Sequence, residues 1–263
     1  MRKKTLTAFF VLSMFLVCVT CAQSREAIQL DDYLTELPFS PGIVAGEMLY
    51  LSGAVGVRPG QQKPEGDISR QTEVTLENLG LVLRKAGLDF ADVVSATVYL
   101  ADARHYSEMN EVYRRFFPQN PPARATVEGA VVVKDALVEI SAIAVKKGVA
   151  RRYLTPASWP QPAAPFSWGV LVGEKVLFLS GLVGSEPASG AFESDFTLQT
   201  RQVFQNMGAL LKAAEMDFAD LVSTRVYLSD SRDFAARNDV YTDVLPEQRP
   251  VRATVQARLA NPG

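Results

Sequence analysis

The strongest constraint on this chain is an internal repeat, because a set of short motifs occurs twice in the same order. The recurring pairs, each separated by 128 residues, are Leu51-Ser52-Gly53 with Leu179-Ser180-Gly181, Asp89-Phe90-Ala91-Asp92 with Asp217-Phe218-Ala219-Asp220, Asn110 with Asn238, and Arg124 with Arg252. Solenoid repeats have periods of roughly 20 to 50 residues, so a period this long indicates two complete domains instead.

The repeat also divides the chain. We expect a signal peptide at residues 1–22, a first domain at residues 23–147 and a second at residues 148–263, with a proline-rich join near residues 146–165. Glu139 lies fifteen residues after Arg124, and the matching position after Arg252 falls beyond Gly263. The second domain as given is therefore expected to lack its last strand, and to be weak or inert as a catalyst.

The first residues are typical of an export signal. A charged start, Met1-Arg2-Lys3-Lys4, precedes the apolar run at residues 8–19 and a small-residue cleavage site. Cleavage after Ala22 would release the protein, whereas lipidation of Cys21 would make it a lipoprotein. We expect a periplasmic or secreted protein that is attached to a membrane only if Cys21 is lipidated.

Composition excludes several chemistries. Both cysteines, Cys18 and Cys21, lie in the leader, and His105 is the single histidine. A mature chain of this kind has no disulfide, no catalytic thiolate, no cysteine-ligated zinc and no Ser-His-Asp triad. We expect neither a metal nor a cofactor. Removal of the leader's three basic residues leaves 24 of the 27 lysines and arginines against 29 acidic residues, so the mature chain has a net negative charge. A net negative charge argues against a nucleic-acid partner.

Each copy is expected to be α+β, with two helices packed on one face of a mixed sheet. The pattern of apolar and turn residues predicts strands at 43–46 and 49–56, a helix at 67–86, a strand at 93–100, a helix at 102–117 and strands at 126–133 and 137–145. The last two strands flank Lys134-Asp135 and are predicted to form a hairpin.

Two arginines occupy matching positions where a loop becomes a strand. Arg124 follows Pro121-Pro122-Ala123, and Arg252 follows Pro250-Val251, each just before a run of β-forming residues. A guanidinium held there is suited to bind a carboxylate, because it offers a rigid and permanently charged fork of donors. A structural ion pair at the start of a strand is the alternative.

Four further residues of the first copy are candidates for a site. Ser52 and Gly53 end an apolar strand, where a backbone can approach a ligand closely, although an ordinary turn explains them too. Asn110 lies among apolar residues in the middle of a predicted helix, where it would need a specific hydrogen bond. The alternative is an asparagine that faces solvent. Glu139 interrupts an apolar strand, where a buried carboxylate must be paired or have a raised pKa, unless it lies on the outward face. In the predicted hairpin, Glu139 would lie roughly 20 Å from Arg124, so a shared site would need another subunit or another register.

Both copies resemble the RidA (YjgF-type) enamine/imine deaminases, also called L-PSP endoribonucleases. The resemblance is carried by Pro-Phe-Ser at 38–40, Leu-Ser-Gly at 51–53, Gln71-Thr72, Asn78, Asn110-Glu111-Val112-Tyr113, Pro-Pro-Ala-Arg at 121–124 and Val-Glu-Ile at 138–140. It implies a chorismate-mutase-like fold that forms homotrimers, with ligand pockets in clefts between neighbouring domains.

The resemblance also implies roles for individual residues. Arg124 would hold the substrate carboxylate and Glu139 would position the water that attacks the imine carbon. The remaining pocket residues would be Phe39, Ser52, Gly53, Asn110 and Thr126, with Phe166, Ser180, Asn238 and Arg252 as equivalents in the second copy.

The implied reaction converts small imines or enamines of the 2-aminoacrylate type to 2-oxo acids and ammonia without a cofactor. A non-catalytic protein that binds small carboxylates is the alternative. An endoribonuclease is disfavoured by the acidic charge and the lack of a histidine pair.

Overall fold

The computed structural model describes residues 25–30 and 38–260, and the predicted signal peptide lies outside them. The first copy contains β1 (Arg25–Ile28), β2 (Gly42–Ala45), β3 (Met48–Val55), α2 (Ile68–Lys85), η1 (Phe90–Asp92), β4 (Val93–Leu100), η2 (Ala103–His105), α3 (Tyr106–Phe116), β5 (Ala123–Glu128) and β6 (Val138–Val145). The second contains β7 (Arg151–Leu154), β8 (Gly169–Val172), β9 (Val176–Leu179), α4 (Phe196–Ala213), η3 (Phe218–Asp220), β10 (Ser223–Leu228), η4 (Ser231–Asp233), α5 (Phe234–Val244), β11 (Val251–Gln256) and β12 (Arg258–Leu259).

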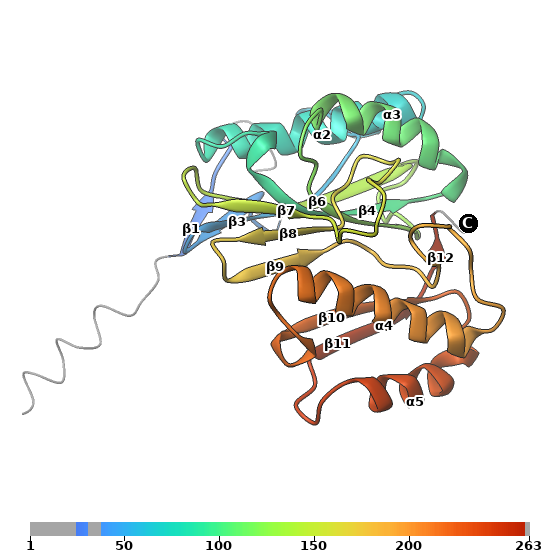
Figure 1. Cartoon of the computed structure of the whole chain (residues 1–263). Helices are drawn as coiled ribbons and strands as arrows, with labels where there is room; N and C mark the ends of the chain where they lie inside the picture. The colour runs from blue at the N-terminus through green and yellow to red at the C-terminus, as the bar shows by residue number, and fades with distance from the viewer. Residues whose placement is uncertain (1–24, 31–37, 261–263) are drawn as a thin grey trace, which may run out of the picture.

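The first copy is a mixed sheet with α2 and α3 on one face, as the sequence predicts (Figure 1). The strand order is β1-β2-β3-β6-β4-β5-β12, and only β4 and β5 run parallel. The Asp67 carboxylate caps α2 by accepting a hydrogen bond from the Arg70 N–H at 2.9 Å. Gly87 follows the helix with a φ of 74°, a conformation that glycine adopts without strain.

The predicted hairpin between the last two strands of the first copy is wrong. β5 ends at Glu128 instead of continuing to residue 133, and β4 lies between β5 and β6 in the sheet. α3 is the crossover that makes β5 parallel to β4, and β6 then fills the space between β3 and β4. Sequence adjacency suggested a hairpin because both segments are apolar runs separated by turn residues.

The second copy repeats this order except for the strand that corresponds to β6. In the first copy β6 joins β3 to β4, so that all strands form one sheet. In the described part of the second copy, β7-β8-β9 and β10-β11 form two separate sheets.

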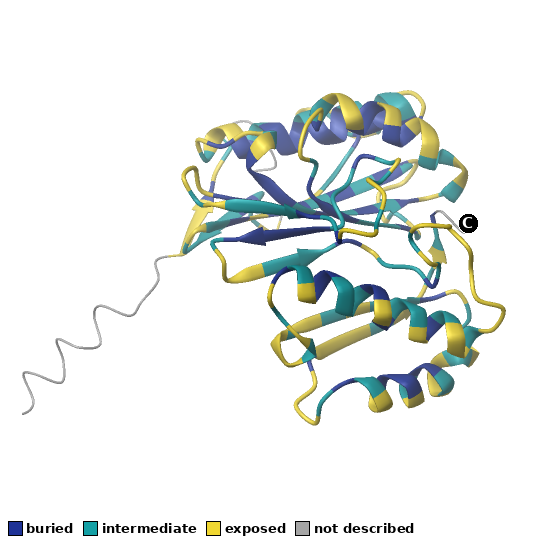
Figure 2. Ribbon diagram, viewed as in Figure 1, coloured by how far each residue is buried: buried dark blue, intermediate teal, exposed yellow. Residues whose placement is uncertain are grey.

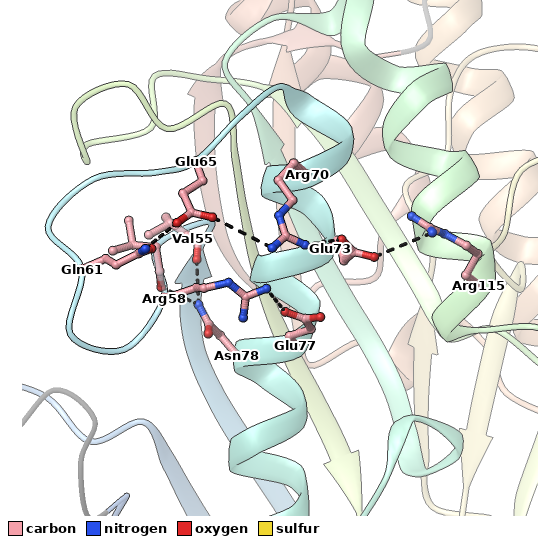
Figure 3. Close-up of polar contacts among 10 residues, drawn as sticks. Val55, Arg58, Gln61, Glu65, Arg70, Glu73, Glu77, Asn78 and Arg115 are labelled. Carbon is pink, nitrogen blue, oxygen red and sulfur yellow. Dashed lines mark hydrogen bonds and ion pairs between the residues drawn. The ribbon is translucent and has the colours of Figure 1, made fainter.

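The loop after β3 is anchored to α2 by polar contacts that recur in the second copy. The Asn78 side-chain amide donates to the Val55 and Val57 carbonyls at 3.0 and 2.8 Å (Figure 3). Asn206 makes the matching bonds to Val183 and Ser185. Figure 3 also shows ion pairs along the outer face of α2, including Arg58 with Glu77 at 2.7 Å.

The two copies stack through their sheets, with helices on the outside (Figure 1). Val94, Ala123 and Val145 of the first copy form one buried cluster with Val170 and Val172 of β8. In addition, β12 pairs antiparallel with β5 and extends the sheet of the first copy. The second copy therefore covers part of the sheet face that is opposite to α2 and α3, around Val94, Ala123 and Val145.

Candidate functional site at the junction of the two copies

Arg124 lies buried at the start of β5, against α3. Its Nη2 donates to the Asn110 side-chain oxygen at 2.7 Å, which accounts for a polar residue in the middle of that helix. The guanidinium carbon lies 4.7 Å from the centre of the Tyr113 ring and 5.9 Å from that of Tyr106. These rings hold the cation by cation–π attraction. We predicted Arg124 and Asn110 as site residues, but we did not predict that Tyr106 and Tyr113 lie beside the arginine.

The second copy completes the surroundings of Arg124. The Arg124 N–H donates to Ser180 Oγ at 2.8 Å, and the Gly181 N–H donates to the Arg124 carbonyl at 3.1 Å. The Phe166 ring centre lies 5.9 Å from the guanidinium carbon. Phe166 and Ser180, which we expected in a separate site of the second copy, therefore lie beside the arginine of the first.

Several buried polar atoms at this junction have no hydrogen-bond partner in the described part of the chain. They are Arg124 Nη1, the Tyr113 hydroxyl and Thr126 Oγ1. Burial raises the pKa of Tyr113 above its usual range, so the hydroxyl stays protonated and can donate. Buried donors are seldom left unpaired, and a guanidinium with a free donor is suited to an anion.

Glu139 lies next to Gly53 and Ser52. A Cβ placed on Gly53 would be 2.1 Å from Glu139 Oε1, so the carboxylate rests directly on the glycine backbone. Ser52 Oγ donates to the Ser40 carbonyl at 2.7 Å, in a segment that begins with the half-exposed Phe39. The structure thus places Glu139 against Gly53, and links the neighbouring Ser52 to the residue that follows Phe39.

Arg124 and Glu139 do not meet within one chain. Along β4, Arg124 is opposite Ala96 whereas Glu139 is opposite Tyr99, three positions further. Side chains alternate between the faces of a sheet, so an odd offset places the two residues on opposite faces. Their separation was predicted from a hairpin that does not exist, and the true reason is this register across β4.

The second copy holds a similar but more open arginine site. Arg252 donates to Asn238 Oδ1 at 2.8 Å and lies 4.9 Å from the Tyr241 ring centre. Arg237 occupies the position that Met109 has in the first copy and is buried, and its Nη1 has no hydrogen-bond partner among the described residues. Burial and the charge of Arg252 together lower the pKa of Arg237 to about 10. We missed Arg237 in the sequence, although aligning the two copies shows the change from Met109.

A cavity of about 380 Å³ lies beside the junction, lined by Phe117, Tyr153, Phe166 and Ser167 among others, but Arg124 is not part of its wall. Within residues 25–30 and 38–260, no three histidine, cysteine or acidic side chains are grouped in a way that could hold a metal ion. The helices of the same residues are all too short or too polar to span a membrane.

Comparison with known proteins identifies the family. The sequence profile of the family described as Endoribonuclease L-PSP matches residues 31–146 and again residues 157–263. The chain therefore belongs to this family, the RidA or YjgF-type proteins, and carries two tandem copies of its domain.

Individual relatives each match a length of about one copy. A RutC family protein from Pyrococcus horikoshii is 41% identical over 111 residues, which cover 42% of this chain and 88% of the relative. Protein DfrA of Myxococcus xanthus is 40% identical over 126 residues, which cover 46% of this chain and 96% of that protein. The human 2-iminobutanoate/2-iminopropanoate deaminase is 36% identical over 110 residues, which cover 41% of this chain and 80% of that enzyme.

Proposed function

We propose that this protein hydrolyses small imines and enamines that carry a carboxylate, giving a 2-oxo acid and ammonia. The observation that carries the proposal is the buried Arg124 guanidinium, whose Nη1 lacks a partner in the described part of the chain. Similarity to a deaminase of 2-imino acids suggests which carboxylates such an arginine would bind.

The proposed chemistry needs few groups, because the substrate is already electrophilic. An arginine holds the carboxylate through charge-assisted hydrogen bonds and so fixes the imine carbon in position. Because Arg124 and Glu139 of one chain lie on opposite faces of the sheet, the arginine and the glutamate of one site would have to come from neighbouring chains. The Glu139 carboxylate would then accept a proton from a water molecule as the water oxygen bonds to that carbon. The proton then passes to the nitrogen and gives a carbinolamine. The hydroxyl proton of the carbinolamine passes to the amine as the C–N bond breaks, so that ammonia leaves and the carbonyl oxygen is the one supplied by water.

A protein that binds small carboxylates without turnover is the second candidate. It is favoured by one specific observation, which is that Arg124 and Glu139 lie on opposite faces of the sheet. In that case the arginines would act as clamps, and no carboxylate would be placed to activate water at the bound ligand.

Ammonia release separates these candidates. The chain from Gln23 onward would be added to a 2-imino acid generated in the assay by an amino-acid oxidase, and to the carboxamide analogue of that imine. We expect faster ammonia release from the imino acid than in buffer, and little acceleration for the uncharged analogue. Binding of the product 2-oxo acid without any acceleration would contradict hydrolysis and support the binder.

A further inference from the structure

The second copy has a buried arginine where the first copy has an apolar residue. Arg237 of α5 is only 5% exposed, and its counterpart Met109 is fully buried in an apolar cluster of the first copy. Arginines are almost never fully buried unless they are paired, because removing a charge from water is costly. An arginine at this position therefore needs a compensating partner.

The described part of the chain does not supply that partner. None of the ion pairs within residues 25–30 and 38–260 involves Arg237 or Arg252. Asp243 of the same helix pairs with Arg201 of α4 instead, at 2.9 Å. The Arg237 Nη1 atom is buried without a hydrogen-bond partner among these residues. Because the pKa of Arg237 is still about 10, the side chain remains charged at neutral pH.

Two guanidiniums of the second copy lie close to the same aromatic ring. The guanidinium carbons of Arg237 and Arg252 are 4.0 and 4.9 Å from the centre of the Tyr241 ring. The corresponding ring of the first copy, that of Tyr113, has the guanidinium of Arg124 beside it and Met109 in place of the second arginine. Two like charges this close repel each other, so negative charge placed between them is stabilised.

Solvent reaches this pair of arginines through Arg252. The strand β11, which carries Arg252, is largely exposed (Figure 2). Arg252 donates through Nη1 to Asn238 Oδ1 at 2.8 Å, a bond that uses one of the five guanidinium donors. Thr254 lies two residues further along β11 and so on the same face, and its Oγ1 is buried without a partner in the described part of the chain. A ligand that binds Arg252 therefore has further unpaired polar groups close to it.

We propose that the second copy binds a small dicarboxylate, with one carboxylate on Arg252 and the other compensating the charge of Arg237. Each guanidinium is suited to paired hydrogen bonds with a carboxylate. Two separate guanidiniums favour two separate anionic groups over one compact group such as phosphate. The residue that makes this site different from that of the first copy is Arg237. The proposal concerns binding alone, and it stands whether or not the protein hydrolyses imines.

The preference for two carboxylates is tested on the unaltered chain from Gln23 onward by isothermal titration calorimetry. The probes are 2-oxoglutarate and 2-oxopentanoate, which differ only in the second carboxylate. We expect 2-oxoglutarate to bind about 10-fold more tightly or better, because it gains charge-assisted hydrogen bonds to a second guanidinium. Equal affinities would overturn the proposal. Inorganic phosphate is the third probe, and phosphate that binds more tightly than 2-oxoglutarate would overturn the assignment to a dicarboxylate.

Arg237→Met tests the residue to which the preference is assigned, because it gives the second copy the side chain of the first. The affinity for 2-oxoglutarate should fall to that for 2-oxopentanoate, and the affinity for 2-oxopentanoate should stay the same because Arg252 is retained. Arg201→Met is the control, since it removes an exposed arginine of the neighbouring helix. It should leave both affinities within about twofold. A preference for 2-oxoglutarate that persists in Arg237→Met would overturn the proposal.

Urea denaturation separates a binding role of Arg237 from a structural one. A buried charge without a partner destabilises the fold, so Arg237→Met should raise the urea midpoint in the absence of ligand. Addition of 2-oxoglutarate should raise the midpoint of the unaltered protein more than that of the variant. A midpoint that falls in the unliganded variant would show that Arg237 serves the packing of the second copy, and would overturn the proposal.

These results are distinguishable from those that test the proposed function. The titrations require no turnover, so a protein that does not hydrolyse imines can still show the preference for 2-oxoglutarate. Conversely, a protein without that preference can still release ammonia from a 2-imino acid, in which case the dicarboxylate site fails and the proposed function stands.

Discussion

Gly53 is the residue on which the geometry of Glu139 depends most directly. The nearest atom to an added methyl group would be the end of the Glu139 side chain, at 2.1 Å, and that side chain can move. Gly53→Ala should therefore keep the fold and displace the carboxylate, with a loss of activity of roughly 100-fold, typical of a misplacement of about 1 Å. Ammonia release would measure the loss of activity, and circular dichroism would show whether the fold is kept.

The matched control for this change is Gly181→Ala. There the new methyl group would meet Ala125 at 3.5 Å, an ordinary contact distance, and no carboxylate. Its activity should stay within a few-fold of that of the unaltered protein. Equal losses of activity in the two variants would show that Gly53 matters for packing and not for Glu139.

Asn110 holds a buried guanidinium, whereas its counterpart Asn238 holds an exposed one. Asn110→Ala would leave Arg124 Nη2 buried without its acceptor, which should lower the free energy of unfolding by about 1–3 kcal/mol. Asn238→Ala should cost no more than about 0.5 kcal/mol, because Arg252 can bind water instead. Urea denaturation of both variants would test the difference, and equal costs would contradict the burial of Arg124.

Residue type and spacing were enough to predict most of the candidate site residues. Arg124 could be predicted because it follows two prolines and precedes a strand, and Glu139 because it interrupts an apolar strand. What could not be predicted is which residues meet. Phe166 lies beside Arg124 because the two copies stack, and no local pattern encodes that contact.

Among the elements, helices were predicted more accurately than strand order. The helix expected at 67–86 is α2, with its aspartate cap, because amphipathic spacing and caps are local signals. The position of β6 between β3 and β4 depends on pairing across the sheet, which is not local. The separation of Arg124 from Glu139 therefore follows from how β5 and β6 pair with β4, which the sequence pattern did not predict.

One ion pair joins an element of the first copy to the first strand of the second. Arg151 of β7 donates to the Asp92 carboxylate of η1 at 2.6 Å, and both side chains are largely buried. Asp92→Asn would leave this arginine charge uncompensated and should cost up to about 3 kcal/mol in the free energy of unfolding. Urea denaturation would measure the loss.

Asp220→Asn is the control, because the two aspartates form the same capping hydrogen bond but only Asp92 also has an ion pair within the described residues. Each accepts a hydrogen bond from the N–H three residues earlier, at 3.0 Å for Asp92 and 2.9 Å for Asp220. Asp220 is exposed and has no ion pair within the described residues. If Asp92→Asn and Asp220→Asn lower the free energy of unfolding equally, the loss comes from the shared capping hydrogen bond and not from the ion pair with Arg151 of β7.

At the scale of the whole molecule, the tandem arrangement makes the two copies unequal. The second copy covers the first, so Arg124 is buried between them while Arg252 stays exposed. Glu139 lies against Gly53, on the face of the sheet opposite to the Arg124 side chain. The tandem arrangement has thus produced one buried arginine site between the two copies, built from Arg124 of the first and Ser180 of the second.

The most direct test of the account is ammonia release from a freshly generated 2-imino acid by Glu139→Gln. Loss of the carboxylate that we propose to activate water should slow hydrolysis by about 100- to 10,000-fold. Glu77→Gln, which changes a surface glutamate paired with Arg58, should hydrolyse the imine as fast as the unaltered protein. Unaltered turnover in Glu139→Gln would contradict the account, because no other residue has been assigned to activate water.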